Sequence, residues 1–140
     1  MSQEKIFNLR AMGAVVILSR SDVGRGHPEY YQDLGKIIAE ERGAYFINQF
    51  GNPDNPLAHE MGTAPEILEQ MGGDLDAIVL GVGSSGTVAG IGSYLKKHAP
   101  GVDLILADPV GSILTDYINK GEIGEGGSWL VEGIGEDFIP

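Results

Sequence analysis

The chain has 140 residues, of which 42% are hydrophobic and none is cysteine, and its formal net charge is -11 at pH 7. This length allows one domain with a real core. The acidic balance excludes nucleic-acid binding through clustered Lys and Arg, and the missing cysteines exclude disulfides, thiolate catalysis and thiolate metal sites. No apolar run approaches the roughly 18 residues of a membrane span, and the first residues lack the apolar core of a signal peptide. We therefore expect a soluble cytoplasmic protein.

Helical patterns and apolar runs alternate along the chain. The spacing of apolar residues predicts helices over 3–12, 28–43, about 66–72, 88–99 and 112–118, and strands over 14–18, 44–47, 76–80 and 102–107. Residues 48–56, with two Asn-Pro steps, are predicted to form an ordered loop, and the residues after 118 another. This alternation predicts an α/β, Rossmann-like fold of three αβα layers around a mostly parallel sheet with right-handed crossovers.

A glycine-rich segment lies between the predicted strand 76–80 and the helix that follows. Its sequence is Gly81-Val82-Gly83-Ser84-Ser85-Gly86-Thr87. Such a loop directs several backbone N–H groups outward at the positive end of a helix dipole, and its glycines allow an anion to approach the backbone closely. The three hydroxyl groups add further donors. The segment is therefore predicted to bind the phosphate of a cofactor.

The same segment fits a second, weaker pattern. Gly81, Gly83 and Gly86 match the dinucleotide fingerprint G-x-G-x-x-G, and Asp108 follows about 20 residues later, where a ribose-binding acid is expected. That fingerprint normally occupies the first βα unit of its domain, however, and three hydroxyls suit a terminal phosphate monoester better. A non-catalytic Rossmann-type module that binds a nucleotide or phosphate stays open as the alternative.

Five motifs occur in order along nearly the whole chain. They are Met1–Lys5 with Leu9–Ala14, Asn48–Phe50 with Asn52-Pro53, Asn55-Pro56 and His59, Thr63–Ile67 with Asp76 before the glycine loop, Asp108–Leu114, and Glu132–Pro140. Together they resemble the pyridoxal-phosphate enzymes of β-replacement, cystathionine β-synthase and cysteine synthase. The wording of the last two motifs is more similar to cystathionine β-synthase. Glu136 departs from the aromatic residue common there, which leaves the choice between homocysteine and sulfide open.

The resemblance implies a partial domain of the tryptophan-synthase-β-like fold. Within this single truncated domain, residues 1–45 resemble the end of the small domain and residues 46–140 the large domain. The resemblance assigns the cofactor phosphate to Gly83, Ser84, Ser85, Gly86 and Thr87, and the substrate to Gln49 and Gly133. Ser85 stands where the family usually has glycine. A homo-oligomer such as a dimer is also implied.

The implied reaction removes the β-substituent of serine or an activated serine and adds a thiol, homocysteine or sulfide. In the family this chemistry needs a lysine that forms a Schiff base with the cofactor, in an N-terminal segment that this chain lacks. The five lysines present are expected on the surface: Lys5, Lys36, Lys96, Lys97 and Lys120. We therefore expect a central fragment of such a lyase or transferase, inactive alone and with no catalytic residue of its own. A role only as an interaction partner stays open.

The three histidines have no spacing that would place two of them on one helical turn, so no metal site is expected. His59, near a predicted helix start, is expected to be a structural residue that forms hydrogen bonds.

Overall fold

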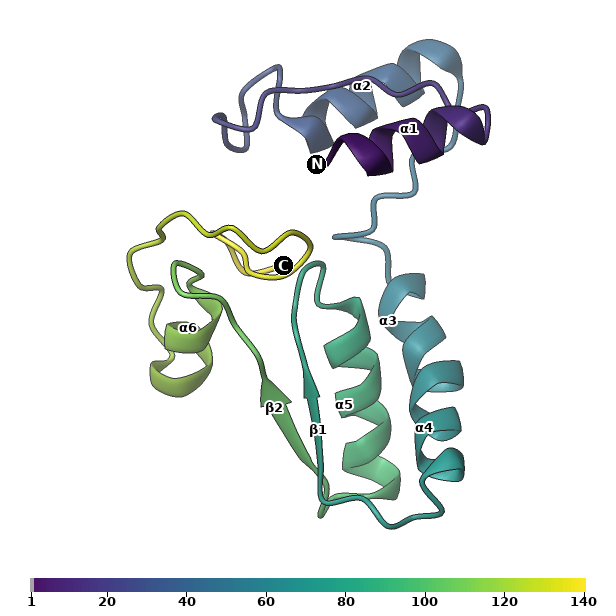
Figure 1. Ribbon diagram of the computed structural model, residues 1–140, viewed down its shortest axis with the longest axis vertical. Helices are drawn as coiled ribbons and strands as arrows, with labels where there is room; N and C mark the ends of the chain where they lie inside the picture. The colour runs from purple at the N-terminus through teal and green to yellow at the C-terminus, as the bar shows by residue number, and fades with distance from the viewer. Residues whose placement is uncertain (1) are drawn as a thin grey trace. The chain divides into compact units, whose positions relative to one another are not determined.

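The computed structural model describes residues 2–140, so Met1, at the start of the first family motif, lies outside the described residues. The chain divides into two compact units, Met1–Asn48 and Gln49–Pro140 (Figure 1). The assignment of residues 1–45 to a small domain and of 46–140 to a large domain stays a prediction.

The first unit contains two helices, α1 (Gln3–Ala11) and α2 (Tyr31–Arg42). Both end close to the predicted residues. Gly43 ends α2 with φ 59°, a left-handed conformation that glycine adopts without a steric penalty. The start of α2 differs from the prediction, because the helix begins three residues after Pro28.

The predicted strands 14–18 and 44–47 are wrong for this structure, because neither segment forms a strand. Their side chains are largely exposed, including Val15 at 77%, Leu18 at 62% and Tyr45 at 81%. A β-strand needs a neighbouring strand to accept and donate its backbone hydrogen bonds. Among residues 2–140 neither apolar run has such a partner, so hydrophobicity alone did not produce a strand.

The second unit is built around a βαβ unit. Its elements are α3 (Asp54–Ala58), the π-helix η1 (His59–Thr63), α4 (Ala64–Gln70), β1 (Ala77–Leu80), α5 (Gly86–His98), β2 (Asp103–Leu106) and α6 (Leu114–Lys120). Strands β1 and β2 pair in parallel, with Ala77 opposite Asp103 and Leu80 opposite Leu106. The predicted α/β fold with a parallel sheet is confirmed, and α5 is the crossover between its two strands (Figure 1).

The core of this unit lies between α5, α4 and one face of the sheet. Ala64, Ile91 and Leu95 are buried, and Ile78 and Leu104 from the two strands pack against them. Because side chains alternate along a strand, the neighbouring positions point to the opposite face. None of the helices in residues 2–140 is long and apolar enough to cross a membrane.

The start of α3 lies inside a segment predicted to be a loop. The Asn52 side chain accepts a hydrogen bond from the Asp54 N–H at 3.0 Å, which satisfies a donor at the helix start. Pro56 then falls in the first turn, where its missing N–H costs no hydrogen bond. The Asn-Pro steps therefore mark a helix start and not only a turn.

Candidate phosphate-binding site

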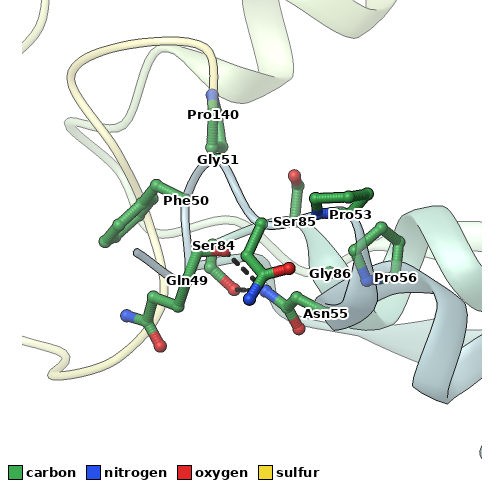
Figure 2. Close-up of a pocket in the computed structure, with 11 residues that line it drawn as sticks. Gln49, Phe50, Gly51, Pro53, Asn55, Pro56, Ser84, Ser85, Gly86 and Pro140 are labelled. Atoms are coloured by element: carbon green, nitrogen blue, oxygen red, sulfur yellow. Dashed lines mark hydrogen bonds between the residues drawn. The ribbon is translucent and has the colours of Figure 1, made fainter. Parts of the chain in front are cut away.

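A pocket of about 220 Å3 opens in the second unit, where the β1–α5 glycine loop lies beside the loop that enters α3 (Figure 2). Its lining residues are Gln49, Phe50, Gly51, Asn52, Pro53, Asn55, Pro56, Ser84, Ser85, Gly86 and Pro140. None of these has a charged side chain, although the chain as a whole carries a net charge of -11. A ligand in this pocket meets backbone dipoles, amides and hydroxyls.

Helix α5 begins at this pocket with Gly86, and the side chain of its N-cap residue, Ser85, forms no capping hydrogen bond. The first N–H groups of a helix have no acceptor within the helix and carry the positive end of its dipole. An anion in the pocket can satisfy them. The N-terminus of α5 is thus the strongest anion-attracting feature of the pocket.

Ser85 precedes α5 in a left-handed conformation, with φ 63° and ψ -8°. A side chain with a Cβ atom disfavours this conformation by about 1–2 kcal/mol. The glycine that the family usually has here would avoid that strain. Ser85 therefore keeps the backbone geometry of the loop at a cost in stability, and its side chain lines the pocket.

Asn55 connects the two loops that form the pocket (Figure 2). Its Nδ2 group donates to the Gln49 carbonyl oxygen at 2.9 Å and to Ser84 Oγ at 3.0 Å. A carbonyl oxygen can only accept, so the contact with Gln49 fixes which way the Asn55 amide points. Ser84 Oγ is consequently an acceptor from Asn55 and keeps its own proton for a ligand.

Packing alone already demands glycine at several positions of the loop. A Cβ atom on Gly86 would overlap the Asn55 amide, and one on Gly83 would lie 2.7 Å from the Gly133 carbonyl oxygen. The segment that contains Gly133 is held here because the Gly135 N–H donates to the Val82 oxygen at 2.8 Å. Close contacts between loops therefore explain some of the glycines without a ligand. The indication of a ligand comes from the backbone N–H and hydroxyl donors of the loop.

Thr87 and His59 form a second polar connection beside the loop. Thr87 Oγ1 lies 3.2 Å from His59 Nε2, and His59 Nδ1 lies 2.9 Å from Thr63 Oγ1. The expectation that His59 forms structural hydrogen bonds is confirmed. His59 is the first residue of the π-helix η1, and its ring contacts Thr87 in the first turn of α5.

Only some of the predicted site residues line the pocket. Gln49, Ser84, Ser85 and Gly86 line the pocket, whereas Gly83, Thr87 and Gly133 do not. The sequence interpretation missed Asn55, which holds Ser84, although the Asn55-Pro56 step already belonged to a family motif.

Asp108 also has a different role from the one a dinucleotide site would give it. Its Oδ2 atom accepts from the Thr115 N–H at 3.0 Å and from the Thr115 hydroxyl at 2.8 Å, at the start of α6. No group of three or more metal-ligating side chains occurs within residues 2–140.

Comparison with known proteins identifies the family to which the chain belongs. Residues 1–140 match the family described as "Pyridoxal-phosphate dependent enzyme". The chain is 40% identical over 141 residues to cystathionine beta-synthase of Dictyostelium discoideum, covering 100% of this chain and 28% of that protein. It is 37% identical over 140 residues to cysteine synthase 3 of Caenorhabditis elegans, covering 100% of this chain and 39% of that protein.

A solved structure is also similar. The crystal structure of an O-acetylserine dependent cystathionine beta-synthase from Helicobacter pylori superimposes with a TM-score of 0.82 and 41% sequence identity, over 99% of this chain and 42% of that one. The chain thus spans less than half the length of these relatives. The predicted resemblance is confirmed over the whole chain, and with it the cofactor on which the family depends. The protein belongs to the pyridoxal-phosphate dependent enzyme family.

Proposed function

We propose that the second unit holds the phosphate of pyridoxal phosphate at the N-terminus of α5, as part of an enzyme of β-replacement. The observation that carries this proposal is the first turn of α5, which the Ser85 side chain does not cap, at a pocket lined by no charged side chain. A phosphate dianion supplies the acceptors that these N–H groups lack. Membership of the family favours pyridoxal phosphate over a dinucleotide, and so do the hydrogen bonds that the Asp108 carboxylate accepts from Thr115 in the first turn of α6.

The residues of the pocket fit this group. The first N–H groups of α5 and the hydroxyl of Ser84 would donate to the phosphate, and Asn55 orients that hydroxyl. Pro53, Pro56 and Phe50 line the same pocket and give it apolar surface beside these polar groups. When bound, pyridoxal phosphate supplies an electron sink for bond cleavage on an amino acid. The Gln49 side-chain amide and the Gly133 backbone are the groups we assign to the substrate.

The substrates proposed are serine or an activated serine and a small thiol, homocysteine or sulfide. Relatives named cystathionine beta-synthase and cysteine synthase support this class, and the name of the Helicobacter pylori relative, O-acetylserine dependent, supports an activated serine. We also propose a homo-oligomer, because Val15, Leu18 and Tyr45 leave apolar surface exposed in the first unit. A clean monomer in sedimentation velocity would contradict the oligomer.

Titration calorimetry should show binding of pyridoxal phosphate and none of NAD. Thr87 does not line the pocket but directly follows Gly86, which does, and we propose that its hydroxyl also donates to the phosphate. Replacing Thr87 with valine is then expected to weaken the binding of pyridoxal phosphate by about 1–2 kcal/mol, because the hydrogen bond from one hydroxyl to a charged group is lost. Thr115→Val removes the same hydroxyl type at the start of α6 and should retain the affinity. Unchanged affinity in Thr87→Val would contradict the phosphate assignment, and binding of NAD alone would favour the nucleotide module.

The 140-residue chain by itself is expected to show no turnover of serine with homocysteine. None of its five lysines lines the pocket, and Lys97 and Lys120 form ion pairs with Glu60 at 2.5 Å and with Asp116 at 2.7 Å. Borohydride reduction with pyridoxal phosphate, followed by peptide mapping, should give weak labelling scattered over several lysines. Stoichiometric labelling of one lysine would refute this expectation and nominate that residue.

A further inference from the structure

His59 stands between two threonine hydroxyls, one on its own π-helix and one at the start of α5. Its Nδ1 atom is 2.9 Å from Thr63 Oγ1, and its Nε2 atom is 3.2 Å from Thr87 Oγ1. A neutral imidazole has one donor nitrogen and one acceptor nitrogen, so the two contacts must run in the same direction. The proton of His59 therefore decides which way the Thr87 hydroxyl points.

The two possible directions differ in what Thr87 offers to the glycine loop. If Nδ1 carries the proton, Thr87 donates its only hydroxyl proton to Nε2, so only its oxygen lone pairs face the glycine loop and it cannot donate to an anion. If Nε2 carries the proton, Thr87 accepts from His59 and its hydroxyl proton is left for an anion. In the second direction Thr63 donates to Nδ1, so every polar hydrogen of the three groups has an acceptor once an anion is bound.

In the contact between Asn55 and Ser84, too, a side chain outside the glycine loop donates a hydrogen bond to a hydroxyl oxygen of the loop. There the Gln49 carbonyl oxygen fixes Asn55 as a donor to Ser84 Oγ, which leaves the Ser84 proton available. Two polar side chains of the α3–η1 segment, Asn55 and His59, thus each contact one hydroxyl of the glycine loop. Ser84 lies two positions before Gly86, the first residue of α5, and Thr87 directly after it.

Close packing of η1 on α5 holds the His59 ring in this position. Gly90 follows Thr87 by one helical turn, and a Cβ atom there would lie 2.6 Å from His59 Cβ and 2.8 Å from the Glu60 nitrogen. The glycine therefore permits a backbone approach that a larger residue would prevent. As a result, the imidazole is fixed by its backbone as well as by its two hydrogen bonds.

We propose that His59 is a positioning residue for the phosphate site, in which Nε2–H donates to Thr87 Oγ1 and turns the Thr87 hydroxyl proton toward the anion. This inference rests on the proposed binding of pyridoxal phosphate at α5. It adds a chain of hydrogen bonds, Thr63 to His59 to Thr87 to phosphate, in which each group donates to the next.

Two substitutions of His59 separate positioning from mere packing. In His59→Asn the amide reaches only the place of Nδ1 and can keep the contact with Thr63, whereas in His59→Gln it reaches the place of Nε2 and can donate to Thr87. We expect calorimetry with pyridoxal phosphate to show a roughly fivefold loss for His59→Asn, the scale of one hydrogen bond, and little loss for His59→Gln. His98→Asn, the same change at a ring that stacks on Tyr94, should bind like the wild type.

Two further measurements complete the test. Affinity for pyridoxal, which lacks the phosphate, should be equal in His59→Asn and the wild type, because the proposed chain acts on the phosphate alone. Nitrogen-15 shifts of the wild-type imidazole should report the proton on Nε2.

The proposal is overturned by a proton on Nδ1, by equal affinities of the Asn and Gln variants for pyridoxal phosphate, or by an equal loss for pyridoxal. Failure of the wild type to bind pyridoxal phosphate would instead overturn the proposed function, and the anion-directed role of His59 with it.

Discussion

Replacing Gly90 with alanine is expected to lower the free energy of unfolding by about 2–3 kcal/mol, near the upper end of the usual cost of overpacking. A Cβ atom at this position of α5 would overlap the Pro56 carbonyl oxygen and approach the Glu60 nitrogen to 2.8 Å. Both are backbone atoms, which cannot rotate away as a side chain can. Relief therefore requires α5 to move away from α3 and η1, and that movement would draw His59 from Thr87.

Gly92 provides a matched control in the same helix. A Cβ atom there would meet only Leu104 Cδ2, at 3.4 Å, the flexible end of a side chain. Because alanine favours a helix over glycine by up to about 1 kcal/mol, Gly92→Ala should be neutral or stabilising. Urea denaturation followed by circular dichroism would measure both variants. Equal stability of the two variants would show that α5 and η1 do not pack as closely as the structure has them.

Local patterns were enough to predict the βαβ unit and the glycine loop. The apolar run 76–80 and the helix after it each carry their own signal, and β1, α5 and β2 lie where those signals are. The helix stop at Gly43 likewise depends on one residue with a left-handed backbone. Such features follow from the residues that form them, so they can be recognised without knowing what packs against them.

Features that depend on distant residues could not be predicted in this way. The runs 14–18 and 44–47 have the composition of strands, but a strand exists only with a partner, and neither has one among the described residues. The role of Asn55 depends on Ser84, which lies 29 positions away along the chain. The π-helical turn at His59 gives no periodic signal that differs from an ordinary helix. Each of these features is decided by tertiary contacts.

Replacing Asn55 with aspartate is expected to reduce the affinity for pyridoxal phosphate on the order of 100-fold. The carboxylate has nearly the shape of the amide but cannot donate, so the hydrogen bond to the Gln49 oxygen is lost and the Ser84 hydroxyl turns its proton toward the carboxylate and away from the phosphate. It also places a negative charge in a pocket whose lining has no charged side chain to offset it. Two like charges a few ångströms apart repel by about 1–4 kcal/mol in partly solvated surroundings.

Two companion variants separate these causes. Asn55→Ala removes the hydrogen bonds without adding charge and should lose about tenfold in affinity, within the range of one hydrogen bond, because the Ser84 hydroxyl is no longer oriented toward the phosphate. Asn119→Asp adds the same charge at an exposed position of α6 that does not line the pocket, and should bind like the wild type. Calorimetry at two salt concentrations would measure all three, with circular dichroism as the check on folding. The difference between Asn55→Asp and Asn55→Ala should shrink as salt rises, because salt screens the added charge. Equal affinities of Asn55→Asp and Asn119→Asp at low salt would mean that the phosphate does not lie beside Ser84, and the anion site would have to be sought elsewhere in the chain.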